Sequence, residues 1–168
     1  MVTSPKLIIV RGPSGAGKST IARAVVDASS RPTALVQRDH YMLMFNEAGR
    51  FSIDQELIGL VILTCLERDV DVVFEGNFKV DTHRGLLGRL FTAHPEEDYI
   101  FYVDVGLEES LRRHASRRQI ISEEKMRELH PLATPLGEPR EVLIPEDTPL
   151  DAAVRLVLDS SGLQSAPS

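Results

Sequence analysis

A short glycine-rich segment near the N-terminus constrains this sequence more than any other feature. Gly12 is followed by four residues and then by Gly17-Lys18-Ser19, which satisfies the phosphate-binding pattern G-x-x-x-x-G-K-[ST]. The apolar run at residues 7–10 predicts a buried strand before the pattern, and residues 21–26 predict a helix after it. Because the pattern is meaningful only between a strand and a helix, these flanks strengthen the prediction of a phosphate loop.

The residue types in this loop suit close contact with phosphate groups. Glycine has no Cβ, so successive backbone N–H groups can converge on phosphate oxygens at the start of a helix. Lys18 would add a positive charge at the β- and γ-phosphates, and Ser19 would offer its hydroxyl to Mg²⁺. The residues predicted to bind nucleotide in this segment are Gly12, Ser14, Gly15, Ala16, Gly17, Lys18, Ser19 and Thr20.

Bulk properties predict one globular domain without disulfides. The chain has 168 residues, of which 42% are hydrophobic and 26% are charged. The formal net charge of −6 argues against nucleic acid as a partner. Cys65 is the only cysteine, which excludes an internal disulfide and a cysteine-based metal site. No signal peptide and no apolar run of about 20 residues is visible, so we expect a cytoplasmic protein without a membrane partner.

Apolar segments that alternate with helical patterns predict an α/β fold. Further strands are predicted from short apolar segments at residues 33–39, 70–74, 99–105 and 141–146. Helical periodicity is clearest at residues 53–68. The residues on the predicted apolar face of this helix are Leu57, Leu60, Val61 and Thr64, and Ile53, Ile58, Ile62 and Leu66 widen it. Five strands that alternate with helices indicate a parallel sheet with helices on both faces. We expect one domain over residues 1–160 and a frayed tail over 161–168.

Acidic residues at the ends of two predicted strands are the candidates for catalysis. Asp39 ends the second strand and Glu75 follows the third, and parallel strands end at the edge where α/β sheets bind ligands. Asp39 is the candidate general base for a hydroxyl in line with the γ-phosphate, or alternatively a cap for a turn at His40. Glu75 is a candidate for contact with Mg²⁺ through water, for a substrate hydroxyl or for a structural salt bridge. Further predicted substrate contacts are Tyr41, Asn77 and Arg84.

The densest positive cluster of the chain lies at residues 112–118. On a helix, Arg113 and Arg117 share a face, so they could close over a triphosphate and stabilise the charge that develops in phosphate transfer. The alternative is that Glu108 and Glu109 pair in solvent with the arginines four residues later.

In chain order, the phosphate loop, Asp39, Glu75, the arginine-rich helix and the late strand 142–145 resemble the small P-loop kinases. This group includes adenylate, shikimate and gluconate kinases, chloramphenicol phosphotransferase and the zeta toxins. The resemblance implies a three-layer α/β sandwich with a five-stranded parallel sheet in the order 2-3-1-4-5. It also implies an arginine-bearing lid at about residues 107–130, with Arg113 and Arg117 as lid arginines, and an adenine site beside Pro145. Glu75 departs from the family pattern, in which Asp is usual at that position.

The sequence therefore predicts an ATP- and Mg²⁺-dependent kinase that phosphorylates a hydroxyl of a small molecule, such as a nucleoside, a sugar-like metabolite or an antibiotic. The absence of a guanine-reading [NT]-K-x-D motif favours ATP over GTP. The predicted catalytic residues are Lys18, Asp39, Arg113 and Arg117. A nucleoside monophosphate kinase, or a nucleotide-dependent switch or toxin-like protein that acts on a partner, remains the alternative. The sequence leaves open the acceptor, the choice of Asp39 or Glu75 as base, and whether the protein is a monomer or a homodimer.

Overall fold

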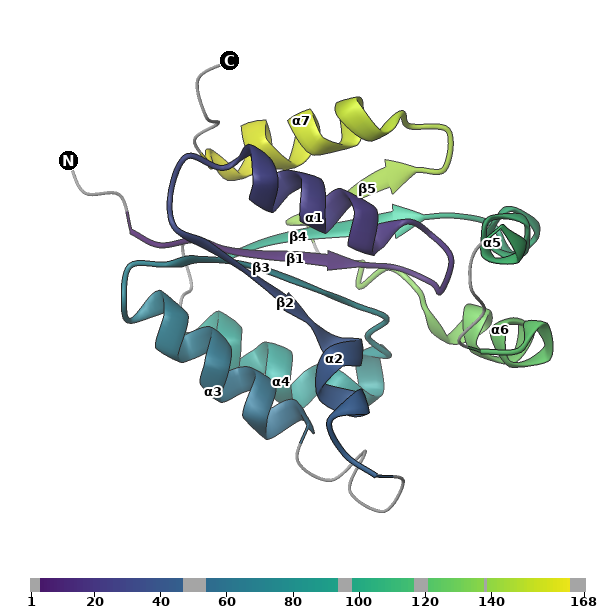
Figure 1. Cartoon of the computed structure of the whole chain (residues 1–168), viewed down its shortest axis with the longest axis horizontal. Helices are drawn as coiled ribbons and strands as arrows, with labels where there is room; N and C mark the ends of the chain where they lie inside the picture. Colours follow the sequence, from purple (N-terminus) through teal and green to yellow (C-terminus); the bar gives the residue numbers. More distant parts are fainter. Residues whose placement is uncertain (1–3, 47–53, 94–97, 117–120, 138, 164–168) are drawn as a thin grey trace.

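The computed structural model describes residues 4–46, 54–93, 98–116, 121–137 and 139–163, and all structural statements below refer to these residues. The centre of the fold is a five-stranded parallel sheet in the order β2-β3-β1-β4-β5 (Figure 1). The strands are β1 (Leu7–Arg11), β2 (Thr33–Gln37), β3 (Asp71–Gly76), β4 (Asp98–Asp104) and β5 (Glu141–Pro145). The predicted fold class and strand order are therefore confirmed.

Helices cover both faces of this sheet and the edge where the strands end (Figure 1). The helices are α1 (Lys18–Ala28), α2 (Arg38–Leu43), α3 (Asp54–Leu66), α4 (Val80–Ala93), α5 (Leu107–Ala115), α6 (Glu123–Leu129) and α7 (Leu150–Ser161), with a 3₁₀ turn η1 at His130–Leu132. Helices α1 and α7 lie on one face, α3 and α4 lie on the other, and α5 and α6 lie beyond the carboxyl ends of the strands. Among these helices, none has both the length and the apolar character of a membrane span.

The central strand β1 separates two hydrophobic cores. Ile8 and Val10 pack in the core beneath α1 and α7, whereas Leu7 and Ile9 pack in the core against α3 and α4. All four side chains are fully buried. A strand that is covered on both faces needs apolar residues at every position, which explains why its sequence is a continuous apolar run rather than an alternating pattern.

The observed ends of β2 and β3 change the positions of the two acidic candidates. β2 stops at Gln37, and the chain turns directly into α2, so Asp39 lies in the first turn of a helix and not at a strand end. A carboxylate in a first helical turn lies near the positive end of the helix dipole, which favours a helix there. β3 runs beyond Phe74 to Gly76, so Glu75 lies within the strand and pairs in register with Gln37.

Helix α3 buries only part of its broad predicted apolar face. Ile58, Ile62 and Leu66 are buried in the core, whereas Leu60 is 63% exposed. Apolar residues occur on nearly all sides of this helix, so their spacing alone does not select the buried side.

The closing helix α7 begins at Leu150. It continues to Ser161, whose hydroxyl donates a hydrogen bond to the carbonyl oxygen of Val157 at 2.7 Å. Gly162 then adopts a left-handed conformation, with φ of 62°, and returns Leu163 to the core with 3% exposure. The packed part of the chain therefore includes residues 161–163, which the prediction assigned to the tail.

Candidate active site

The phosphate loop connects β1 to the first turn of α1, and its glycines have positive φ angles. These angles are 146° at Gly12, 82° at Gly15 and 96° at Gly17. A Cβ at Gly12 would lie 2.6 Å from the carbonyl oxygen of Val103, and one at Gly15 would lie 2.5 Å from that of Ser110. Backbone conformation and close packing against β4 and α5 therefore both require glycine here.

Lys18 is the first residue of α1, and its side chain folds back over the loop. Its Nζ donates a hydrogen bond to the carbonyl oxygen of Pro13 at 2.7 Å, and the residue is only 8% exposed. Gly17, just before it, is the N-cap residue of α1. A phosphate held at this helix N-terminus would meet backbone N–H groups of the first turn together with the Lys18 charge.

Ser19, Glu75 and Gln37 meet on the face of the sheet that carries α1. The Ser19 hydroxyl donates to Oε1 of Glu75 at 2.9 Å, and the side-chain amide of Gln37 donates to the same oxygen at 2.8 Å. Glu75 is 5% exposed. Gln37 was not predicted from the sequence; its signal is its position as the last residue of β2, in register with Glu75 on the neighbouring strand.

This trio can receive a magnesium ion. A serine hydroxyl has one proton, so the bond to Glu75 leaves the oxygen lone pairs of Ser19 available to a cation. Hydroxyl and carboxylate oxygens are ligands that suit Mg²⁺, which keeps several waters and binds few protein groups directly. Within the described part of the chain, no group of three or more His, Cys, Asp or Glu residues forms a protein-only metal site. The chemistry of the donors therefore fits a Mg²⁺ ion that is shared between the protein, water and a phosphate ligand.

Asp39 and Tyr41 both lie on α2, but in different surroundings. Asp39 is exposed and makes no hydrogen bond or ion pair with the described residues. The alternative that Asp39 caps a turn at His40 is therefore not supported by a capping hydrogen bond. Tyr41 packs against the core that contains α3 and α4; burial raises its pKa, and Cys65 raises the pKa further.

Asn77 follows β3 and approaches the phosphate loop from the side. Its Nδ2 donates to the Ser14 hydroxyl at 3.4 Å, while its buried Oδ1 finds no hydrogen-bond partner among the described residues. Asn77 therefore retains one acceptor for a ligand beside the loop. Arg84, the other predicted substrate contact of this region, is exposed on the second turn of α4.

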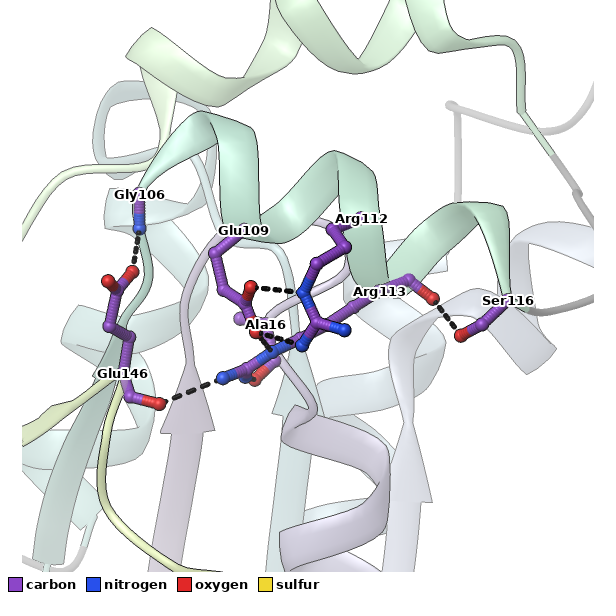
Figure 2. A network of polar contacts seen from close by, with 7 residues as sticks. All are labelled: Ala16, Gly106, Glu109, Arg112, Arg113, Ser116 and Glu146. Atoms are coloured by element: carbon purple, nitrogen blue, oxygen red, sulfur yellow. Dashed lines mark hydrogen bonds and ion pairs between the residues drawn. The ribbon is translucent and has the colours of Figure 1, made fainter.

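On the other side of the loop, Arg113 of α5 joins two segments that are distant in sequence (Figure 2). Its Nη1 donates to the carbonyl oxygen of Ala16 in the phosphate loop at 3.0 Å. Its Nη2 donates to the carbonyl oxygen of Glu146, just after β5, at 2.8 Å. Arg113 therefore lies beside the phosphate loop.

Glu109 holds this arginine and its neighbour in place (Figure 2). Its Oε1 accepts from Nε of Arg113 at 2.6 Å, and both of its oxygens accept from Arg112. These hydrogen bonds, that of Arg112 first, lower the pKa of Glu109 to about 2. The pair of Glu109 and Arg113 matches the predicted i,i+4 spacing, whereas Glu108 contacts Arg127 of α6 at 3.4 Å instead of Arg112.

The loop after β5 is tied to the beginning of α5. The Glu146 carboxylate accepts a hydrogen bond from the Gly106 amide at 2.9 Å, in addition to the bond between its carbonyl oxygen and Arg113. Pro145 precedes Glu146 at the end of β5 and is exposed. The exposed Pro145 ring thus lies beside a loop that the arginine fixes.

Helix α6 completes the cover over the phosphate loop. The Ser122 hydroxyl caps this helix by accepting from the Lys125 amide at 3.2 Å. Met126 is 1% exposed, and its methyl group lies 3.2 Å from the position that a Cβ on Gly15 would occupy. Arg117, the second predicted lid arginine, lies outside the described residues.

Comparisons with solved structures place this fold among small kinases. A sugar kinase from Janibacter sp. HTCC2649 is 16% identical, with 95% of each chain covered and a TM-score of 0.75. The tunicamycin resistance protein of Deinococcus radiodurans is 14% identical, with 98% of this chain and 99% of that chain covered and a TM-score of 0.73. The Mycobacterium tuberculosis APS kinase CysC, in complex with AMPPNP and APS, is 16% identical, with 94% and 97% covered and a TM-score of 0.71.

Sequence comparison gives the family. No curated protein matches the sequence. The model of an AAA domain family, AAA_33, matches residues 7–136, a segment that runs from β1 past α6 and includes the phosphate loop, Asp39, Glu75 and Arg113. The chain therefore belongs to the AAA domain family AAA_33, and it has the fold of the small P-loop kinases.

Proposed function

We propose that this protein is an ATP- and Mg²⁺-dependent kinase that transfers the γ-phosphate of ATP to a hydroxyl of a small molecule. One observation carries the proposal: the phosphate loop, the hydrogen-bonded pair of Ser19 and Glu75, and the exposed carboxylate of Asp39 lie at the same edge of the sheet. The similarity in fold to a sugar kinase and an APS kinase supports a phosphotransferase.

The nucleotide would bind between the phosphate loop and the loop after β5. Backbone amides of the loop and the Lys18 ammonium would hold its phosphates, while Pro145 would flank the adenine. Arg113 bridges Ala16 and Glu146, so it lies where it can approach both parts of the nucleotide. The residues proposed to bind nucleotide are Gly12, Ser14, Gly15, Ala16, Gly17, Lys18, Ser19, Thr20, Arg113, Arg117 and Pro145, with residues 107–130 as the lid.

Ser19 would bind Mg²⁺ directly, and Glu75 would contact it through water. Bound there, the ion would neutralise negative charge on the β- and γ-phosphates. Gln37 and Ser19 both donate to Oε1 of Glu75, so they fix the orientation of the carboxylate without using its second oxygen.

Asp39 is the proposed base because it alone of the two acidic candidates is exposed and without a protein partner in the described structure. Its carboxylate would accept the proton of the acceptor hydroxyl while that oxygen forms a bond to the γ-phosphorus and the bond to the β-phosphate oxygen breaks. Lys18 and the lid arginines would stabilise the negative charge of this transfer. Glu75 already accepts two hydrogen bonds and is buried, which suits positioning rather than proton transfer.

The acceptor is proposed as a hydroxyl compound of low molecular weight. The similar structures include proteins named for a sugar, for APS and for tunicamycin resistance, which supports this class without selecting a member. Tyr41, Asn77 and Arg84 are the proposed contacts around it, together with Asp39 and Glu75.

The test measures ADP release from Mg-ATP against a panel of nucleosides, nucleoside monophosphates, sugars, amino sugars and hydroxylated antibiotics. We expect one class to stimulate release and Asp39→Asn to lower the stimulated rate by about 10²- to 10⁴-fold with unchanged affinity for Mg-AMPPNP. Lys18→Ala should abolish turnover. Asp27→Asn is the matched control, because Asp27 is an exposed carboxylate on α1.

Unchanged turnover in Asp39→Asn would refute the assignment of the base. Stimulation by nucleoside monophosphates alone would identify a nucleotide kinase. If Mg-AMPPNP binds and no compound stimulates ADP release, the small-molecule kinase is refuted, and macromolecular acceptors or partners become the next candidates.

A further inference from the structure

We propose that Arg11 is a positioning residue of the kinase site, which fixes the turn after β3 and the segment after α6 relative to the phosphate loop. The inference rests on the proposed function. Arg11 is the last residue of β1 and directly precedes Gly12. It is 1% exposed, and its register partners are Gly76 of β3 and Tyr102 of β4.

One guanidinium contacts three separate segments. Its Nη1 donates to Oε1 of Glu141 at 2.7 Å, in an ion pair whose side chains are 1% and 2% exposed. Its Nη2 donates to the carbonyl oxygen of Phe78, two residues after the end of β3, at 3.1 Å. The guanidinium carbon lies 5.2 Å from the ring centre of Tyr102. Arg11 thus connects the start of β5, the turn after β3 and strand β4.

Two of the residues that contact Arg11 also bind the segment 133–137, which connects the proposed lid to β5. The second carboxylate oxygen of Glu141 accepts from the amides of Leu136 and Gly137. The Tyr102 hydroxyl donates to the carbonyl oxygen of Ala133. The carboxyl-terminal end of the lid is therefore attached to the sheet at two points, and Arg11 is the group that both attachments contact.

The turn after β3 connects Arg11 to the proposed active site. Phe78 follows Asn77, whose side chain contacts Ser14 in the phosphate loop. At Gly76, a Cβ would lie 2.8 Å from the Cβ of Arg38 and 2.9 Å from the Phe78 ring. Such close packing leaves little room for the turn to shift alone, so a displacement of Phe78 would move Asn77 and Glu75 as well.

Stability alone does not account for this buried pair. The other residues of β1, Leu7 to Val10, are apolar and fully buried. Replacement of a buried ion pair by apolar residues of similar volume is often neutral or stabilising, because burial removes both charges from water. If the residue at position 11 served packing alone, an apolar side chain would therefore be expected there.

The experiment compares the apolar swap Arg11→Met/Glu141→Leu with the wild type and with Arg31→Met. Arg31 forms an ion pair with buried Asp71 at 2.9 Å and lies at the opposite edge of the sheet, so its loss lowers stability away from the site. The measured quantities are the midpoint of thermal unfolding, the Kd of Mg-AMPPNP, and kcat/KM for the acceptor that the panel identifies.

We expect the swap to lower the unfolding midpoint, because the Phe78 carbonyl and the amides of Leu136 and Gly137 lose their hydrogen-bond partners. Its Kd for Mg-AMPPNP should change by less than about threefold, while kcat/KM for the acceptor falls about 10²-fold, because displacements near 1 Å can have that effect. Arg31→Met should also lower the unfolding midpoint, but with normal kcat/KM. A swap that turns over the acceptor like the wild type would overturn the proposal.

Arg11→Lys tests the proposal if the swap does not fold. Lysine retains a cation for Glu141 but has no second nitrogen to reach the Phe78 carbonyl. A loss of kcat/KM with unchanged Mg-AMPPNP affinity supports the positioning role, and full activity overturns it.

Hydrogen exchange separates this proposal from the proposed function. If the wild type has no acceptor-dependent activity, the proposed function fails. In that case, faster amide exchange at residues 76–78 and 133–137 in the swap would support the positioning role of Arg11. Unchanged exchange would contradict it.

Discussion

The Ser19 hydroxyl and the Glu75 carboxylate form a hydrogen bond of 2.9 Å between the first turn of α1 and the end of β3. The bond engages the hydroxyl proton of Ser19. It therefore leaves an oxygen with free lone pairs beside the proposed γ-phosphate position. This relationship connects the phosphate loop to the metal chemistry that a kinase requires.

Removal of the Ser19 hydroxyl should weaken the use of Mg²⁺. In Ser19→Ala, the Mg²⁺ concentration that gives half-maximal ATP-dependent turnover should rise about tenfold or more, because one oxygen ligand is lost. Ser19→Thr is the matched control, since threonine also satisfies the loop pattern and retains the hydroxyl. A Mg²⁺ titration of ADP release measures both variants; equal Mg²⁺ requirements in Ser19→Ala and the wild type would contradict the assignment.

Glu109 should matter for nucleotide affinity, and its neighbour Glu108 should not. Glu109→Gln removes the anion that orients Arg113 between Ala16 and Glu146, so the Kd of Mg-AMPPNP should rise about five- to tenfold. Glu108 is an exposed residue whose contact with Arg127 at 3.4 Å lies at the surface. Calorimetric titration with Mg-AMPPNP compares the two variants, and similar affinities would show that the orientation of Arg113 does not matter.

Two glycine substitutions should change stability in opposite directions. Gly15→Ala should lower the free energy of unfolding by more than about 1 kcal/mol, because φ is 82° and the Cβ would lie 2.5 Å from the Ser110 oxygen. Gly88→Ala should raise it by about 0.5–1 kcal/mol, since the position is exposed within α4 with no atom in the way. Urea unfolding tests both changes; a stabilised Gly15→Ala would disprove the packing argument.

Asp98 should make stability depend on pH. It is 6% exposed, neither carboxylate oxygen has a hydrogen-bond partner among the described residues, and burial raises its pKa from 3.8 to about 7 despite the opposing charge of Arg140. The folded state therefore binds the proton more tightly than the unfolded state. Stability from this group is highest below pH 3.8 and decreases as the pH rises to about 7, by up to about 1.4 kcal/mol per pH unit.

The substitution Asp98→Asn isolates this effect. Asparagine does not titrate, so the loss of stability between pH 5 and pH 7.5 should be smaller in the variant than in the wild type. Urea unfolding at the two pH values measures the difference. Parallel pH profiles of the two proteins would show that the carboxyl group ionises normally in the fold.

The resemblance to the small P-loop kinases implied the strand order that the sheet has, and the sequence assigned both Ser19 and Glu75 to Mg²⁺ without predicting the hydrogen bond between them. The phosphate loop fixes the direction of β1 and α1, and the parallel arrangement brings the ends of neighbouring strands to one edge. The position of Asp39 was less accurate, because β2 gives way to a helix two residues before it.

Contacts made by backbone carbonyls escaped prediction. Arg113 binds the carbonyl oxygens of Ala16 and Glu146, and Arg11 binds that of Phe78. Every residue has a carbonyl group, so no residue type marks such an acceptor in the sequence. The ion pair of Arg11 with Glu141 joins residues far apart in the chain, and only the completed sheet brings them together.

The strand order has a consequence for the way in which the chain folds. β1 is synthesised early, but its neighbours in the sheet are β3 and β4. Leu7 can therefore pair only after Val72 and Asp98 have been synthesised. Contacts between residues so distant in sequence close large loops and form slowly. During synthesis, the phosphate loop therefore leaves the ribosome well before the neighbouring strands β3 and β4. A nucleotide can stabilise only a chain that has been made at least as far as β4.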